Sequence, residues 1–380
     1  MATRRWGLPL CMMGMLLVFP AAGLGGEAKS PVRIGVVQPL TGNAAYQGTN
    51  LLDGIKVAVD EINGRGGILG GRKVEIAVED DQCNPAQATA VTKKLISEGH
   101  RIIVGALCSS ATFAVLEVTK KENVVQVAPL SYAPGLTEQG ARFFFRTSSN
   151  SLIIARGFAE FIAKNEKPGS TIALLVVNDD WGRSDAAAFV KDFERLGNPK
   201  VVFNGTFNFQ DTDFSTVVSK IKALKPNAMY MVARDPQNSQ MVNQMAALGM
   251  GSVTVYGSEN NYSPSFLQGA GKNAEGVYAV VPWTPDLRDP ASAHFKEEYR
   301  KKFGKDPAQT FSHSGYSGMW VTALGVDKAG TDTDLNKIRE ALEKLVWEGP
   351  GATWKFDEKH QALVAPHIVQ VRSGQYVTVK

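Results

Sequence analysis

The chain has 380 residues, a length that predicts two domains rather than one. Hydrophobic residues make up 44% and charged residues 21%, the composition of a globular protein with ample core. The net charge of +4 at pH 7 comes without any run of basic residues, so we expect no nucleic-acid partner.

The N-terminus has the pattern of a secretory signal. Arg4 and Arg5 precede an apolar run from Leu8 to Phe19, and small residues follow it. The apolar run is shorter than the roughly 20 residues that a membrane-spanning helix needs. We therefore predict that residues 1–26 are a cleaved signal peptide and that the mature chain is exported as a soluble protein.

Because an exported protein enters an oxidising compartment, its cysteines can form disulfides. Cys11 lies inside the predicted signal, which leaves Cys83 and Cys108 in an oxidising compartment. The two either form a disulfide, which would stabilise the fold by roughly 3–4 kcal/mol, or remain as buried free thiols.

From Val32 onward, short apolar runs of strand length alternate with segments of helical period. Strands are predicted over 32–37, 73–78, 102–107, 124–127, 143–147, 171–177, 201–207, 228–233, 253–256, 276–283, 353–356 and 367–371. Helices are predicted over 51–63, 85–98, 151–164, 184–196, 214–224, 236–248, 290–303, 315–329 and 334–346. Such alternation produces parallel sheets with helices on both faces, and the strands are too many for one sheet. We predict an α/β fold of two doubly wound lobes.

One junction between a strand and a helix has the features of an anion site. The apolar run Ile102–Leu107 ends at Cys108, and a helix follows from Ser109 and Ser110. The first N–H groups of a helix lack partners and its dipole is positive there, so a small anion can bind. The alternative is that the two serines only cap the helix.

Three other features favour structural roles. The Gly-rich link 64–71 follows a helix and lacks the Lys-Ser/Thr ending of a phosphate loop, so we expect a connection. Asp80 and Asp81 end a strand and could hold a metal, but no matching Lys or Thr accompanies them, and we favour a solvated loop. None of the five histidines has the spacing of a catalytic triad or a metal site, and we expect His313 to be packed or at the surface.

A series of motifs, in order along residues 32–371, carries a resemblance to a known family. The motifs are VVQPLTG at 36–42, AVDEINGRGGI at 58–68, DDQCNPAQA at 80–88, GALCSSAT at 105–112, APLSYAPGLT at 128–137, NDDWG at 178–182 and GSEN at 257–260. The chain resembles type I periplasmic solute-binding proteins of the leucine/isoleucine/valine-binding family. The resemblance implies two lobes, joined by a three-stranded hinge, that close on a ligand in the cleft between them.

The resemblance also implies domain boundaries and a disulfide. The first lobe would comprise residues 31–149 and 284–352, and the second lobe 150–283 and 353–380. Cys83 and Cys108 match the disulfide pair of the leucine-binding members.

Three positions match residues that bind an amino acid in the family. Ser109 matches the serine that holds the ligand carboxylate, the main chain of Leu130 matches groups that hold the amino acid backbone, and Glu259 matches the acid that pairs with the ammonium. The remaining residues predicted to bind ligand are Ser110, Ser131, Tyr132, Trp181, Arg234, Tyr316, Tyr46 and Gln47.

Three of these positions depart from the leucine-binding pattern. Tyr132 replaces a small threonine, Gln47 replaces an aromatic residue, and Arg234 replaces a tyrosine. Arg234 indicates an added acidic group on the ligand, a partner for Glu259, or a solvated charge beside Asp235.

The predicted function is the extracytoplasmic solute-binding component of an ABC importer, with a branched-chain amino acid or a relative as ligand. The alternatives are an aromatic or other small organic acid as ligand, or a sensory module for amides, urea or amino acids. We expect a periplasmic monomer that works with ABC permease subunits of the inner membrane, without a cofactor, a metal or enzymatic activity.

Overall fold

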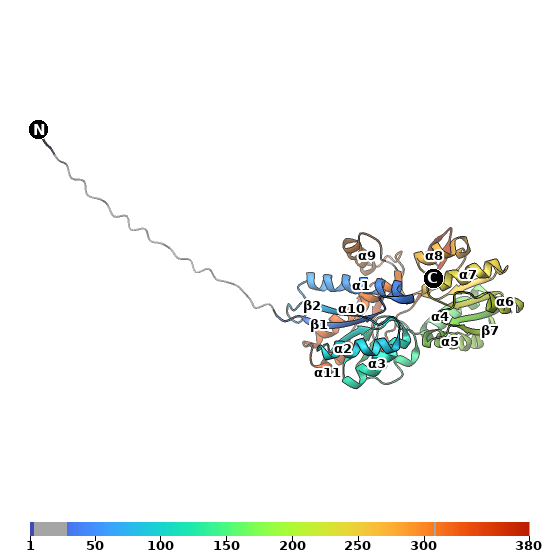
Figure 1. The fold of residues 1–380 in the computed structure, drawn as a ribbon, viewed down its shortest axis with the longest axis horizontal. Helices are drawn as coiled ribbons and strands as arrows, with labels where there is room; N and C mark the ends of the chain where they lie inside the picture. The colour runs from blue at the N-terminus through green and yellow to red at the C-terminus, as the bar shows by residue number, and fades with distance from the viewer. Residues whose placement is uncertain (4–28, 308, 380) are drawn as a thin grey trace.

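A computed structural model describes residues 1–3, 29–307 and 309–379, and shows the chain folded around two separate sheets (Figure 1). All of the predicted signal segment after residue 3 lies outside this description. None of the described helices is long and apolar enough to cross a membrane.

The first sheet has five parallel strands in the order β2-β1-β3-β4-β5. Its strands are β1 (Val32–Gln38), β2 (Val74–Asp80), β3 (Ile102–Gly105), β4 (Val125–Ala128) and β5 (Phe144–Arg146). The central strands β1, β3 and β4 consist mostly of fully buried Val and Ile, because helices cover both faces of the sheet. These helices are α1 (Ala45–Gly64), α2 (Pro85–Ser97), α3 (Ser109–Glu122), α10 (Gln309–Ala329) and α11 (Leu335–Glu343).

The second sheet has seven strands in the order β14-β13-β10-β9-β8-β6-β7. Its strands are β6 (Thr171–Val177), β7 (Lys200–Phe207), β8 (Ala228–Val232), β9 (Thr254–Gly257), β10 (Tyr278–Val281), β13 (His367–Arg372) and β14 (Gln375–Thr378). The helices of this part are α4 (Ser151–Asn165), α5 (Asp180–Leu196), α6 (Ser215–Ala223), α7 (Gln237–Ala247) and α8 (Pro264–Ala270). We call the elements around the five-stranded sheet the first lobe and those around the seven-stranded sheet the second lobe.

The second sheet corrects the expectation of purely parallel strands. Strands β6 to β10 are parallel, but β13 runs antiparallel to β10, and β14, which was not predicted, is antiparallel to β13. A tight turn at Ser373 and Gly374 joins these last two strands, and the carboxylate of Glu275 accepts both of its N–H groups, at 2.9 and 3.2 Å. A local hairpin therefore completes the edge of the sheet.

The chain passes between the two lobes three times, after β5, after β10 and after the hairpin of β11 (Trp347–Gly349) and β12 (Ala352–Trp354). These crossings confirm the predicted three-stranded hinge. After the second crossing, α9 (Pro290–Phe303) and α10 return to α1 in the first lobe.

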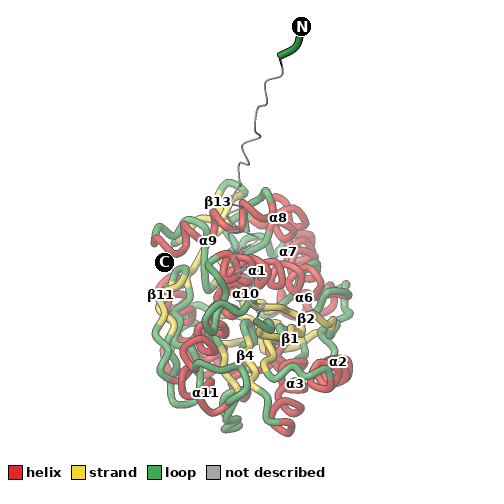
Figure 2. The backbone as a smooth tube through the Cα atoms, turned by 90° about the vertical axis from the view of Figure 1, so that its left-hand side faces the viewer, coloured by secondary structure: helices red, strands yellow, loops and turns green. Residues whose placement is uncertain are grey.

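Two glycines allow α1 and α10 to lie side by side (Figure 2). A Cβ atom on Gly54 would lie 1.8 Å from the carbonyl oxygen of Ser312, and one on Gly315 would lie 2.0 Å from that of Leu51. Backbone therefore contacts backbone here, which brings the start of α10, with Phe311, close to the start of α1.

Several helices begin earlier than predicted. The helix α1 begins at Ala45 rather than Leu51, and α5 begins at Asp180 rather than Ser184, because the Asp179 carboxylate accepts the N–H of Gly182 at 2.8 Å. The helix α3 begins at Ser109, and its N-cap is Cys108, which makes no side-chain capping bond. The alternative that Ser109 and Ser110 only cap this helix is therefore wrong.

Candidate functional site

A small cavity, with a free volume of about 20 Å³, lies between the two lobes at the carboxyl ends of the parallel strands. The volume is small because the lining side chains of the two lobes lie close together. The first lobe contributes Gln47, Leu107, Ser109, Leu130, Tyr132 and Phe311 to its lining. The second lobe contributes Trp181, Arg234, Glu259 and Asn260, from the segments that follow β6, β8 and β9.

The disulfide secures the first-lobe wall of the cavity. Cys83 is bonded to Cys108 with their Cα atoms 5.5 Å apart, which confirms the predicted pairing. The neighbouring hydroxyl of Ser109 is buried and accepts the N–H of Ala133 at 3.2 Å. The start of α3 is thus fixed both to the loop after β2 and to the loop after β4.

In the second lobe, the side chain of Arg234 is buried beside two aromatic rings and a carboxylate. Its guanidinium carbon lies 4.6 Å from the ring centroid of Trp181 and 5.1 Å from that of Phe209. Its Nη1 atom lies 3.1 Å from Oδ2 of Asp179, and only 4% of its side chain is exposed. Of the three alternatives for Arg234, the solvated charge beside Asp235 is therefore wrong, and the ion-pair partner of Arg234 is Asp179, not Glu259.

Glu259 places a carboxyl group in the same cavity with 5% of the residue exposed. Burial raises the pKa of this carboxyl to about 8, with a smaller increase from the charge of Asp185 and a partial decrease from Arg234. Its neighbour Asn260 donates from Nδ2 to Oε1 of Glu259 at 3.2 Å. In the closed form of the cavity the carboxyl group of Glu259 is therefore mostly protonated at neutral pH.

A second buried carboxyl group lies behind Glu259. Asp185 on α5 accepts a hydrogen bond from the hydroxyl of Tyr230 and is 2% exposed. Burial raises the pKa of Asp185 to about 7. This side chain does not line the cavity, so its effect on the site is electrostatic.

The lobes touch directly across the cavity. Nε2 of Gln47 on α1 donates to Oδ1 of Asn260 at 3.0 Å, and both side chains are buried. At the rim, Nδ2 of Asn43 donates to Oε1 of Gln210 at 3.3 Å in an exposed contact. The structure is therefore a closed form of the molecule.

The structure brings most of the predicted binding residues to this one cavity. Those that line it are Gln47, Ser109, Leu130, Tyr132, Trp181, Arg234 and Glu259.

Four other predicted residues do not line the cavity. The hydroxyl of Ser131 faces Thr112 and the carbonyl of Leu107, at 2.5 and 3.0 Å, and Ser110 lies half-buried on α3. The hydroxyl of Tyr316 donates to Glu61 at 2.6 Å, because α10 presents this residue to α1.

Tyr46 is the fourth of these residues. It reaches across the cleft to Ser265 of the second lobe and meets Phe311 edge-on, with ring centroids 6.4 Å apart. Tyr46 therefore contacts the second lobe but does not line the cavity.

Sequence reasoning missed three lining residues, Leu107, Asn260 and Phe311. The first two are next to predicted residues and could have been included from the ends of β3 and β9. Phe311 had no local signal, because α10 was expected to begin at Gly315 and its approach to α1 depends on tertiary packing.

The expectation of a solvated acidic loop after β2 is wrong for Asp81, which is 0% exposed. Asp80 is also engaged, since its carboxylate accepts the N–H of Leu40 at 2.8 Å and the hydroxyl of Thr41 at 2.6 Å. No group of acidic, His or Cys side chains among the described residues could hold a metal ion.

His313 is packed, as expected. It stacks on Trp283 with ring centroids 5.5 Å apart, and its Nε2 lies 2.8 Å from the carbonyl oxygen of Pro350. Burial lowers the pKa of His313 to about 4, so its ring is neutral at physiological pH.

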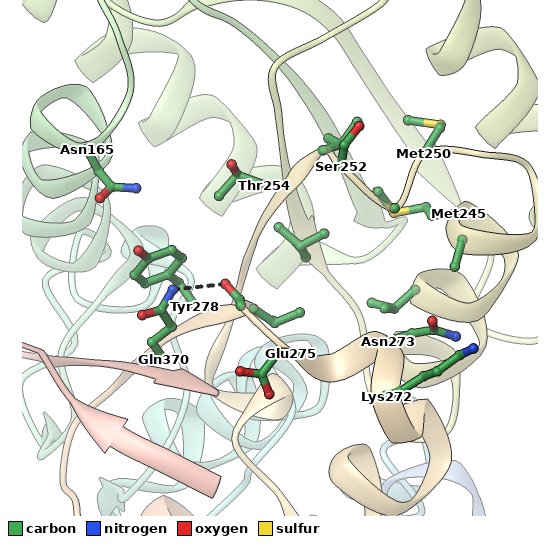
Figure 3. A pocket seen from close by; sticks show the side chains of 17 residues that line it. Asn165, Met245, Met250, Ser252, Thr254, Lys272, Asn273, Glu275, Tyr278 and Gln370 are labelled. Carbon is green, nitrogen blue, oxygen red and sulfur yellow. Dashed lines mark hydrogen bonds between the residues drawn. The ribbon is translucent and has the colours of Figure 1, made fainter. Parts of the chain in front are cut away.

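A larger pocket opens on the second lobe alone, where β9 and β10 begin (Figure 3). Met245 and Met250 are among its lining residues, and Nε2 of Gln370, which also lines it, donates to the carbonyl oxygen of Gly276 at 3.4 Å. It lies at the opposite strand ends from the cavity between the lobes, and closure of the lobes cannot enclose it. It is therefore not the candidate site.

The sequence pattern of a family described as periplasmic binding protein matches residues 31–375. A leucine-, isoleucine-, valine-, threonine- and alanine-binding protein of Pseudomonas aeruginosa is 30% identical over 332 residues, which cover 87% of each chain. Among solved structures, a leucine-binding protein of Thermotoga maritima superposes with a TM-score of 0.85 at 24% identity, covering 92% of this chain and 98% of the other. A solute-binding protein of R. palustris in complex with benzoate has a TM-score of 0.84 at 21% identity, covering 92% and 96%.

Proposed function

The chain belongs to the periplasmic binding protein family, and we propose that it is the solute-binding component of an ABC importer with an amino acid as its ligand. The observation that carries the proposal is one cavity, built by both lobes, that sets the start of α3 opposite the carboxyl group of Glu259. An α-amino acid needs this pair of features, an anion site and a facing acid.

In the proposed binding mode, the ligand carboxylate binds at the start of α3. The first N–H groups of this helix have no helical partners, and the hydroxyl of Ser109 lies beside them. The disulfide at Cys108 holds these donors in position before the ligand arrives, which reduces the ordering cost of binding.

The ligand ammonium is proposed to pair with Glu259. A cation beside this carboxyl group favours its ionised form and lowers the pKa that burial has raised. The second lobe then closes Trp181 over the ligand, facing Tyr132 at a distance of 6.4 Å between ring centroids. Closure excludes water, and both charged groups of the ligand are matched.

A second candidate ligand is a small aromatic acid. The cavity has aromatic walls in Tyr132, Trp181 and Phe311, and a protonated Glu259 can donate a hydrogen bond to a carboxylate. The solute-binding protein of R. palustris, which has the same fold, was solved in complex with benzoate, so this fold can bind an aromatic acid.

Calorimetry on unfolded and refolded, ligand-free protein tests the proposal with panels of amino acids and of aromatic acids. We expect saturable binding of at least one amino acid with one site per chain. Binding of aromatic acids alone would select the second candidate, and no binding across both panels would contradict the proposal of a solute-binding function for this cavity.

We infer that the chain works in the periplasm as a monomer, delivers its ligand to ABC permease subunits of the inner membrane, and binds without catalysis. The family membership supports this inference. Capture of membrane permease subunits by the liganded protein is the expected result. Capture of a soluble regulator instead would favour the alternative of a sensory module.

A further inference from the structure

The guanidinium of Arg234 is held in place in the cavity wall by residues of its own lobe. Trp181 and Phe209 cover the group, and the carboxylate of Asp179 fixes one end of it. Asp179 is itself held, because its other oxygen caps α5 through the N–H of Gly182. A side chain ordered this way loses little further entropy when a ligand binds.

Arg234 also has an unused donor. Its Nη1 atom is fully buried, and no described residue accepts a hydrogen bond from it, since Asp179 lies within ion-pair distance but outside hydrogen-bond geometry. A buried donor without an acceptor destabilises the site, and the cost is larger for a charged group. The guanidinium of Arg234 thus needs a further hydrogen-bond acceptor, and a ligand in the cavity can supply it.

A branched aliphatic side chain would not supply it. Such a side chain would bury the guanidinium further without offering an oxygen, which increases the cost of the unpaired donor. The apolar wall formed by Leu107, Leu130 and Phe311 belongs to the opposite lobe.

Building on the amino acid binding proposed above, we propose that Arg234 selects an amino acid whose side chain carries a carbonyl-type oxygen, over one with a branched aliphatic side chain. That oxygen accepts from an N–H of the Arg234 guanidinium, while α3 and Glu259 hold the carboxylate and the ammonium. The side-chain oxygen belongs to an amide or to a carboxylate.

Charge favours the amide. Arg234 and Asp179 already form a neutral pair, and the ligand ammonium is matched by Glu259. A second ligand carboxylate would therefore add an uncompensated negative charge to a closed cavity. Glutamine and asparagine are the expected ligands, ahead of glutamate and aspartate.

Calorimetry with glutamine, asparagine, glutamate, aspartate, leucine and valine on the refolded protein tests the inference. We expect the amides to bind at least tenfold more tightly than leucine. Arg234→Met replaces the guanidinium with an apolar chain, and we expect it to weaken glutamine binding by tenfold or more while leucine binding is unchanged or stronger. Arg183→Met is the control, because this arginine lies outside the cavity and pairs with Asp180 at the surface, with 52% of its side chain exposed.

Asp179→Asn provides a second variant that keeps both Arg234 and the cap of α5. Because it removes the charge that balances the guanidinium, we expect the preference to shift from amide to carboxylate side chains. This variant decides the question if Arg234→Met does not fold, as judged by its thermal unfolding.

Three outcomes are separable. Tighter binding of leucine or valine than of the amides would overturn this inference and leave the proposed function intact. If Arg234→Met lost the same affinity for every ligand, the inference would also be overturned. Arg234 would then contact the backbone groups that all amino acids share, not the side chain. Absence of binding for all amino acids would overturn the proposed function itself.

Discussion

At the scale of single residues, Glu259 distinguishes the two candidate ligand classes. A ligand with an ammonium group needs the ionised carboxylate of Glu259. A ligand without one binds to the protonated carboxyl group, which a glutamine side chain replaces closely because both can donate a hydrogen bond. We predict that Glu259→Gln weakens amino acid binding by about 2 kcal/mol or more, roughly 30-fold in Kd. Calorimetry of wild type and variant measures this loss. Unchanged amino acid affinity would mean that the ammonium does not contact Glu259.

Asp185 makes stability depend on pH. Its pKa is raised from 3.8 in the reference state to about 7 in the fold, so the folded chain keeps this proton while the unfolded chain loses it. The contribution of Asp185 to stability is therefore fully present below about pH 4 and is lost as the pH rises to about 7.

We predict that Asp185→Asn removes this loss, because an amide stays neutral and still accepts from Tyr230. The melting temperature of the variant, relative to wild type, is expected to be higher at pH 8 than at pH 4.5. Thermal unfolding of both proteins at the two pH values measures this. A constant offset between them would show that Asp185 titrates normally.

At the scale of elements, a buried arginine joins the hinge to the binding loop. Arg146 at the end of β5 is 0% exposed, and no carboxylate among the described residues forms an ion pair with it. Its guanidinium donates to the carbonyl oxygens of Ser131 and Ala133, at 3.0 and 2.6 Å, and to Oε1 of Gln361 on the third crossing at 2.6 Å. The loop that carries Leu130 and Tyr132 is thus positioned by a side chain from the hinge.

We predict that Arg146→Lys, which keeps the charge but not the forked donors, weakens ligand binding about tenfold beyond its effect on stability. Ser149→Ala is the matched control, because Ser149 bonds Val364 across the same hinge without touching the binding loop. Its stability is expected to fall by about 1 kcal/mol with unchanged Kd. Chemical unfolding and calorimetry on each variant separate the two effects, and equal Kd values for both variants would show that Arg146 is only structural.

Elements were more predictable than contacts between them. Alternating runs of strand length and helical period place nearly every helix and strand of the parallel sheets, because burial on both faces demands those patterns. The hairpin β13–β14 escaped prediction in part, since short edge strands carry little apolar signal. The two lobes followed from the number of strands and from the resemblance, not from any boundary signal in the sequence.

Site residues on strand-to-helix loops were identified from the family resemblance, and the fold class places ligands at the same loops. Tyr316 was nevertheless misplaced. Its direction depends on the close approach of α1 and α10 at Gly54 and Gly315, which no local pattern encodes. The partner of Arg234 was likewise missed. The sequence suggested Glu259 or Asp235, whereas packing selects Asp179, which no sequence pattern had indicated.

At the scale of the whole molecule, binding and closure are one process. Trp181, Arg234 and Glu259 belong to the second lobe, and Ser109 and Leu130 to the first, so one ligand contacts both sets only in the closed form. Ligand affinity therefore includes the free energy of contacts between the lobes themselves.

The hydrogen bond from Gln47 to Asn260 is the buried part of those contacts. Because it forms only when the lobes close, its loss should leave the encounter with the open form unchanged and speed reopening. We predict that Gln47→Ala raises the ligand dissociation rate about tenfold, the kinetic equivalent of one buried hydrogen bond, with little change in the association rate. Stopped-flow tryptophan fluorescence, with Trp181 as the reporter in the cavity, measures both rates.

Asn43→Ala is the control. It removes the exposed contact with Gln210 and is expected to leave both rates unchanged, because water replaces that partner. If the two variants released ligand at the same rate as wild type, closure would depend on the ligand alone, and the contacts between the lobes would contribute nothing to retention.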